Sequence, residues 1–155
     1  MRNINYADIS LLNIALFIWQ LPQNIIAILI YVLLHRRPIE YTNEHTGMTV
    51  LWIPVNGTTC WSLGQFIFAY PDASEQVLKH ETGHCLQSLY LGPLYLLAVA
   101  IPSVCLFWWR RWFKKSPQWY KSHYPESWAD NLGGVEKWAL FGENQNGYVR
   151  ILSVI

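Results

Sequence analysis

Apolar residues gather in two long runs, and the longer run lies near the start of the chain. No charged side chain occurs at residues 9–34, and a helix of this length would reach roughly 39 Å. Because the hydrocarbon core of a bilayer is about 30 Å thick, the pattern predicts a transmembrane helix within an N-terminal unit of residues 1–38. Pro22 predicts a kink in this helix. A buried core helix is the alternative, whereas the length of the run disfavours a signal peptide.

The second apolar run, residues 94–109, ends in the densest basic cluster of the chain, residues 110–115. About 16 residues are too few for a simple crossing of the bilayer. A crossing would also place this cluster on the opposite side from Arg36 and Arg37, against the tendency of basic residues to stay in the cytoplasm. We therefore expect a membrane-inserted segment at residues 93–113 that is either re-entrant or lies in the membrane plane.

Short strands are predicted between the two runs. Residues 49–53 and 63–69 are rich in β-branched and aromatic side chains, which favour strands. Asn56-Gly57 between them predicts a hairpin turn and hence a short antiparallel sheet. These segments are either ordinary core strands, or the strand before the next helix also lies along a cleft and pairs with an extended peptide.

A helix is predicted at residues 73–91 with clear signals at both ends. Asp72 can cap its first turn, and Glu75 stands three residues later as the reciprocal member of a capping box. A glycine-proline pair follows the last residue, which is typical of a helix end. Together the patterns predict an α+β, membrane-associated fold, with the sheet, this helix and the inserted segment in a second unit of residues 39–155.

The composition narrows the class of partner. Of the 155 residues, 14% are charged and 52% are hydrophobic, with nine tryptophans and nine tyrosines, whereas about a quarter of a soluble domain is usually charged. Indole and phenol rings favour the membrane–water interface, so a lipid bilayer is an expected partner. The formal net charge of +1 argues against a nucleic-acid partner, because such proteins carry a concentrated basic face. Three cysteines without CxxC spacing argue against a disulfide framework and favour the reducing side of a membrane.

The most distinctive chemical motif is His-Glu-Thr-Gly-His at residues 80–84, inside the predicted helix. His80 and His84 are four residues apart, so both imidazoles project from one helix face and suit two ligands of a tetrahedral Zn²⁺. Glu81 can reach a metal-bound water as a general base. Gly83 is a poor helix former, and it would let another backbone come close. The pentapeptide alone is a weak indication, because H-E-x-x-H occurs by chance in unrelated proteins.

A second polar motif, Glu-Ser-Trp-Ala-Asp at residues 126–130, follows Pro125 and predicts the start of another helix. Glu126 and Asp130 share a face of that helix. One carboxylate can supply the third zinc ligand, and the other can accept a hydrogen bond from the far nitrogen of a ligand histidine. Such a string usually marks a solvated helix face, but the chain has only ten carboxylates and already carries H-E-x-x-H.

The two motifs, with the glycine pair Gly133-Gly134 soon after them, resemble those of the gluzincin metallopeptidases. The integral-membrane branch that includes the CAAX prenyl endopeptidases and the HtpX-type proteases is the most similar. This chain is shorter than those proteins and lacks the helical hairpin that they carry between the two motifs. The resemblance implies that His80, His84 and Glu126 bind Zn²⁺, that Glu81 activates water, and that Asp130 orients His80.

Other assignments remain open at this stage. His123 or Asp130 can replace Glu126 as the third ligand, although Glu126 ranks first. A residue that stabilises the oxyanion is also needed, and His123 and Tyr124 are candidates, with Tyr120 nearby. If Glu126 meets both histidines, the segment between the motifs must leave and return on one side of the membrane.

The predicted function is therefore a membrane-embedded zinc metallopeptidase that hydrolyses peptide bonds with zinc-activated water and a glutamate base. A peptide or membrane-protein substrate is expected, with an integral-membrane location and an active site facing the cytoplasm. The alternative is a non-enzymatic membrane protein whose structural or vestigial zinc site serves a binding module.

Overall fold

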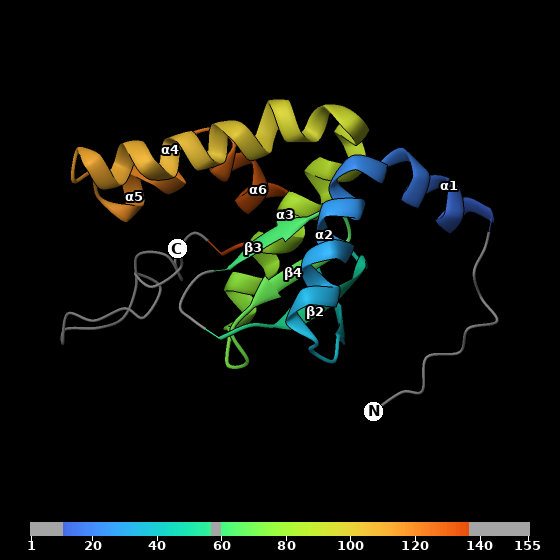
Figure 1. The fold of residues 1–155 in the computed structure, drawn as a ribbon. Helices are drawn as coiled ribbons and strands as arrows, with labels where there is room; N and C mark the ends of the chain where they lie inside the picture. The colour runs from blue at the N-terminus through green and yellow to red at the C-terminus, as the bar shows by residue number, and fades with distance from the viewer. Residues whose placement is uncertain (1–10, 57–59, 137–155) are drawn as a thin grey trace.

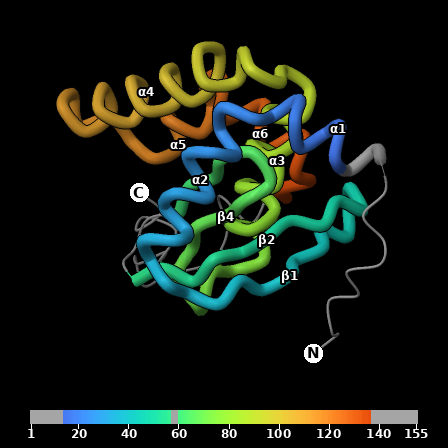
Figure 2. The backbone as a smooth tube through the Cα atoms, turned by 45° about the vertical axis from the view of Figure 1, so that its right-hand side comes forward, coloured from blue at the N-terminus to red at the C-terminus, as the bar shows by residue number. Residues whose placement is uncertain are grey.

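The computed structural model describes residues 11–56 and 60–136 and has an α+β fold with a small open sheet. The sheet lies between two helices, with α2 on one face and α3 on the other, and α4 extends across one end of these layers (Figure 1). The tube in Figure 2 shows the same layering from a second direction. The α-helices are α1 (Leu11–Trp19), α2 (Leu21–Leu34), α3 (Glu75–Leu91), α4 (Ile101–Trp112), α5 (Pro117–Lys121) and α6 (Glu126–Gly133).

Within the described residues the sheet has four strands in the order β1-β2-β4-β3. They are β1 (Ile39–Thr42), β2 (Thr49–Pro54), β3 (Trp61–Leu63) and β4 (Phe66–Ala69). The pairs β1–β2 and β3–β4 are antiparallel, but β2 and β4 run parallel, with Ile53 opposite Phe68. The prediction of a purely antiparallel sheet was therefore wrong for its central pair.

The connection after β2 explains this difference. The chain passes to the far edge of the sheet before β3 begins, so β2 and β3 are not neighbours and form no hairpin. Gly57 of the predicted turn lies outside the described residues. The hairpin instead joins β3 to β4 through Gly64, whose φ is +61° and where a Cβ atom would collide with the side chain of Asn24. Only glycine fits both conditions.

Strand β4 carries the core because side chains are buried on both of its faces. Successive side chains of a strand point to opposite faces. Phe66 and Phe68 pack with Ala27 beneath α2, whereas Ile67 and Ala69 pack against α3. The α3 side is completed by the buried residues Val50, Cys60, Val77, Leu78 and Cys85.

The N-terminal apolar run forms two helices where one transmembrane helix was predicted. Gln20 interrupts the run with φ −102° and ψ 21°, and Pro22 lies in the first turn of α2, where its missing N–H costs no helix bond. Gln20, Gln23 and Asn24 are fully buried, so the polar residues of this run pack against protein. Among the described residues, no helix combines the length and the apolar character needed to cross a bilayer. This finding overturns the predicted N-terminal transmembrane helix, and with it the predicted integral-membrane location with a cytoplasm-facing site.

Helix α3 begins two residues later than predicted. Ser74 is its N-cap, and the Ser74 hydroxyl accepts a hydrogen bond from the Val77 N–H at 3.4 Å. The helix ends before Gly92, as predicted. Helix α6 begins at Glu126, directly after Pro125, as its motif predicts.

The segment predicted to insert into the membrane forms a bent helical rod. A 3₁₀ turn (Gly92–Leu94) and a π turn (Leu96–Ala100) lead into α4, and α5 and α6 return beneath it (Figure 1). Pro102 has no N–H to donate to the Ala98 carbonyl four residues earlier. The Tyr124 hydroxyl donates to that carbonyl instead, at 2.6 Å. Residues 148–152, Tyr-Val-Arg-Ile-Leu, have a composition that predicts a strand, and they lie outside the described residues.

Candidate metal centre

Glycines let α3 and α6 approach each other backbone to backbone. A Cβ atom on Gly83 would collide with the carbonyl of Ala129, and one on Gly133 would collide with the carbonyl of Lys79. The prediction that Gly83 admits a second backbone is confirmed. This approach carries the ligand residue of α6 to the two histidines of α3.

The three predicted ligands converge on one point. The Nε2 atom of His80 lies 3.2 Å from Oε2 of Glu126, and Nε2 of His84 lies 3.5 Å from the same oxygen. All three side chains are buried, and their ligand atoms lie within 4.8 Å of one another. Donors bound to one tetrahedral Zn²⁺ at about 2.0–2.2 Å would be roughly 3.3–3.6 Å apart. The cluster can therefore hold a metal ion.

Each histidine is oriented through its other ring nitrogen. Nδ1 of His80 lies 2.6 Å from Oδ1 of Asp130, and Nδ1 of His84 lies 2.7 Å from Oε1 of Gln87. The Gln87 amide also donates to the carbonyl of Pro125, at 2.9 Å. Because both Nδ1 atoms are engaged with acceptors, each histidine turns its Nε2 atom towards Glu126, where the neutral ring can bind a metal.

Glu126 is held by groups from α4 and α5. The Ser103 hydroxyl donates to Oε1 of Glu126 at 2.5 Å, which leaves Oε2 for the histidines. The Tyr120 hydroxyl lies 3.3 Å from the Ser103 hydroxyl. Sequence reasoning missed Ser103, because it lies in a run interpreted as membrane-inserted. The signal was available, since Ser103 is the only serine of that run.

The charges of the cluster reinforce one another. Burial and Lys121 lower the pKa of His80, but the carboxylates of Asp130 and Glu126 outweigh them and raise it to about 9. Burial raises the pKa of Glu126, yet His84 and His80 hold it well below its usual range. The pKa of Asp130 is likewise lowered despite its burial, by His80 and Lys121. Glu126 and Asp130 are therefore anionic, as metal ligation and histidine orientation require.

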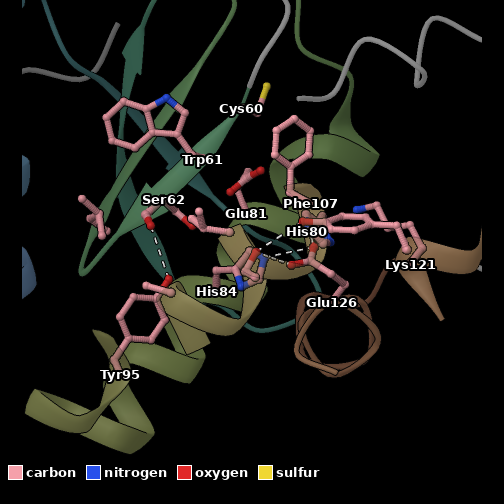
Figure 3. Close-up of a pocket in the computed structure, with 15 residues that line it drawn as sticks. Cys60, Trp61, Ser62, His80, Glu81, His84, Tyr95, Phe107, Lys121 and Glu126 are labelled. Carbon is pink, nitrogen blue, oxygen red and sulfur yellow. Dashed lines mark hydrogen bonds and ion pairs between the residues drawn. The ribbon is translucent and has the colours of Figure 1, made fainter. Parts of the chain in front are cut away.

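A cavity of about 370 Å³ opens beside the three ligands and is lined by Glu81 (Figure 3). The Glu81 side chain is 2% exposed, and within the described part of the chain its Oε2 atom has no hydrogen-bond partner. An unpaired buried carboxylate oxygen is costly unless something polar meets it. The rest of the wall is mainly apolar, from Trp61, Leu63, Tyr95, Val104 and Phe107, with Ser103, Tyr120 and Lys121 among its polar groups.

The two predicted oxyanion donors do not line this cavity. His123 is exposed, its ring packs on Trp119 with centroids 4.2 Å apart, and its Nδ1 lies 2.5 Å from the Trp119 carbonyl. Tyr124 is 52% exposed and caps the Ala98 carbonyl. Tyr120, the third aromatic candidate, is buried and does line the cavity.

The strand next to the cavity is also different from the predicted one. Strand β4, which precedes α3 in the chain, is paired on both sides and has no free edge. Strand β3 is the edge strand, and its residues Trp61, Ser62 and Leu63 line the cavity.

A second buried polar cluster joins the C-terminal half of α3 to α2. The Gln23 amide donates to the Ser88 hydroxyl at 2.8 Å and to the Gly92 carbonyl at 2.9 Å, and Ser88 donates to Oε1 of Gln20 at 2.8 Å. A further link, from the Asn43 amide to the Gly133 carbonyl at 2.9 Å, holds the end of α6 to the β1–β2 connection. Sequence reasoning predicted neither link.

No family model, curated protein or solved structure matches this chain. The likeness to gluzincins therefore rests on the two short motifs alone, and the geometry of the cluster carries the functional argument.

Proposed function

We propose that this protein is a zinc-dependent endopeptidase with Glu81 as its general base. The observation that carries the proposal is the convergence of His80, His84 and Glu126 beside a cavity that Glu81, with one unpaired carboxylate oxygen, also lines. Two histidines and one carboxylate form a ligand set typical of catalytic zinc in peptidases.

A zinc ion in this site would supply Lewis-acid activation of a water molecule and of a peptide carbonyl. Glu81 accepts the proton of that water as it attacks the carbonyl carbon, and then delivers the proton to the leaving amine. The mainly apolar wall excludes bulk water, which strengthens the electrostatic interactions inside the cavity.

Tyr120 is the hydrogen-bond donor that we propose for the oxyanion. Burial and the neighbouring Glu126 raise the pKa of its hydroxyl, so the hydroxyl keeps its proton. Asp130, Gln87 and Ser103 position the ligands and touch no substrate in this scheme.

An extended peptide substrate fits the edge of the sheet. Strand β3 is short, lies at the edge and lines the cavity with three successive residues. A peptide added beside it would form main-chain hydrogen bonds and carry its scissile bond towards Glu81. Large apolar substrate side chains suit the wall formed by Trp61 and Phe107.

Three ligands favour the enzyme over the alternative of a structural site. Structural zinc sites are almost always closed by four protein ligands, whereas catalytic sites keep a position for water. Among the described residues, the cluster offers three ligand groups, and Cys60 and Cys85 do not belong to it.

Metal content is the first test. Elemental analysis of the purified protein should find one zinc per chain, and the His80→Asn/His84→Asn variant should lose it. His35→Asn is the matched control, because His35 is exposed, lies at the end of α2 and has a φ of 49° that asparagine tolerates. Zinc that survives the loss of both site histidines would refute the proposed centre.

Peptide cleavage is the second test. The zinc-loaded protein is incubated with a complex mixture of natural peptides, and new termini are identified by mass spectrometry. Glu81→Gln should retain zinc and lose cleavage, while Tyr120→Phe should retain zinc and lose about 10²- to 10³-fold in rate. Cleavage that persists in Glu81→Gln would contradict the role of this residue, and zinc without any cleavage by the unmodified protein would favour the non-enzymatic alternative.

A further inference from the structure

The outer side of α4 and of the π turn before it exposes a row of large apolar side chains. Leu97, Ile101, Val104, Trp108 and Trp112 are each more than half exposed, and Trp112 is 84% exposed. Their spacing of three or four residues places them along one side of the helical rod. No residue of α4 is buried. We call this row of five residues the apolar row.

A dense positive charge follows the apolar row. Arg110, Arg111, Lys114 and Lys115 lie at the C-terminal end of α4 and just beyond it. No acidic residue occurs anywhere between Glu81 and Glu126. The apolar row therefore has basic neighbours in its own stretch of the chain, and that stretch contains no carboxylate to neutralise them.

We propose that α4 docks flat on the surface of an anionic lipid bilayer. Interfacial helices of this kind bury an apolar side at the boundary between headgroups and acyl chains, and their basic residues contact anionic headgroups. Indole rings such as those of Trp108 and Trp112 favour that boundary. Docking in the plane of the surface requires no spanning helix.

Charge complementarity favours a bilayer over a second copy of this chain. Two copies that met through the apolar row would offer the basic residues no carboxylate from the same stretch of the partner copy, whether the two helices ran parallel or antiparallel, and an interface without complementary charge is unfavourable for them. An anionic headgroup layer provides the opposite charge along with an apolar interior. A bilayer therefore complements both the apolar row and the basic residues beside it.

The docking surface adjoins the metal centre through α4 itself. Val104 belongs to the apolar row and also lines the cavity, and Phe107 lines it from the next turn. The cavity therefore lies just behind the helix that meets the bilayer. The docking proposal does not depend on peptidase activity, and its test measures binding alone.

Vesicle sedimentation with the full-length protein tests the proposal. The protein should pellet with vesicles of phosphatidylcholine and phosphatidylglycerol at least tenfold more strongly than with phosphatidylcholine alone, and added salt should weaken this binding. Trp108→Ser/Trp112→Ser should weaken binding by at least tenfold. The matched control is Leu29→Ser/Leu33→Ser, which changes two exposed side chains of α2 and should bind as the unmodified protein does.

A charge-reversal pair separates the electrostatic part. Arg111→Glu/Lys115→Glu should lose on the order of fivefold in affinity for each cation that is removed, whereas Arg36→Glu/Arg37→Glu at the end of α2 should have little effect. Circular dichroism verifies that each variant is folded. Failure of the unmodified protein to bind anionic vesicles overturns the proposal. Equal losses of vesicle binding in the test and control variants also overturn it. A dimer that forms without lipid and that the tryptophan substitutions dissociate would overturn it as well.

Discussion

Two buried polar clusters lie on α3, less than two turns apart, and they differ in chemistry. Towards α6, His80 and His84 meet two carboxylates, and Glu81 lines a cavity. Towards α2, Ser88 meets the amides of Gln20 and Gln23, and these three residues do not line that cavity. The first cluster is ionisable and opens on a cavity, whereas the second is neutral. The first therefore has the features of a site that could hold a metal ion, whereas the second holds two helices together.

Both clusters contain a buried oxygen without a hydrogen-bond partner in the described part of the chain. They are Oε2 of Glu81 and Oε1 of Gln23. A lone unpaired oxygen is therefore not sufficient to identify a site. Glu81 is distinguished because it lines the same cavity as three convergent candidate metal ligands.

The largest effect is expected where the backbones of α3 and α6 meet. Gly83→Ala should abolish zinc binding and lower the free energy of unfolding by about 3 kcal/mol, because its Cβ would collide with a backbone carbonyl that cannot move independently. Urea unfolding and zinc content measure the two effects. Gly47→Ala is the control, since a Cβ there meets no atom within 4 Å and costs only the strain of its positive φ, about 1 kcal/mol. Normal zinc content in Gly83→Ala would show that the close approach is dispensable.

An intermediate effect is expected from the residue that orients a ligand. Asp130→Asn should weaken zinc affinity by about 10- to 100-fold, because an amide no longer accepts the Nδ1 proton of His80 as strongly as a carboxylate does. Competition with a coloured chelator measures the affinity. Glu75→Gln, which removes a 2.9 Å ion pair with Lys79 on the same helix, should leave zinc affinity unchanged. Equal affinities in the two variants would remove Asp130 from the centre.

The smallest effect is expected in the neutral cluster. Ser88→Ala should lower the free energy of unfolding by about 1.5 kcal/mol, because buried amide groups of Gln20 and Gln23 lose a partner. Zinc affinity should stay within about twofold of its original value. If Ser88→Ala weakened zinc binding as strongly as Asp130→Asn does, the two clusters would be parts of one functional unit.

The sequence predicted local features well where a side chain has only one sensible role. The sequence predicted a close backbone approach at Gly83, a helix start after Pro125 and a helix end before Gly92. The structure has all three features. The spacing of His80 and His84, together with the Glu-Ser-Trp-Ala-Asp motif, also predicted which residues converge at the candidate metal centre. Such features depend on a few neighbouring residues and the backbone geometry that they allow.

Long-range packing could not be predicted in the same way. An uncharged run is compatible with a lipid or with a protein environment. The three buried amide side chains from Gln20 to Asn24 favour protein because they find hydrogen-bond partners in Ser88, Gly92 and Gln65, which lie far away in the sequence. The parallel pairing of β2 and β4 likewise depends on which edge the chain reaches after β2. Tyr124 was assigned to chemistry because it is close to Glu126 in sequence, whereas the carbonyl freed by Pro102 determines its position.

The hydrogen bond from Asn43 to Gly133 spans 90 positions of the chain and bears on the order in which the molecule assembles. Helix α6 has eight residues, and isolated helices of that length are not stable in water. Its position depends on α3 and on the β1–β2 connection, so Glu126 can join the histidines only after the sheet has formed. A nascent chain that ends before α6 holds two of the three ligands. If the centre binds zinc as proposed, zinc is loaded late in folding, and a full complement of zinc would report that α6 has reached its place beside α3.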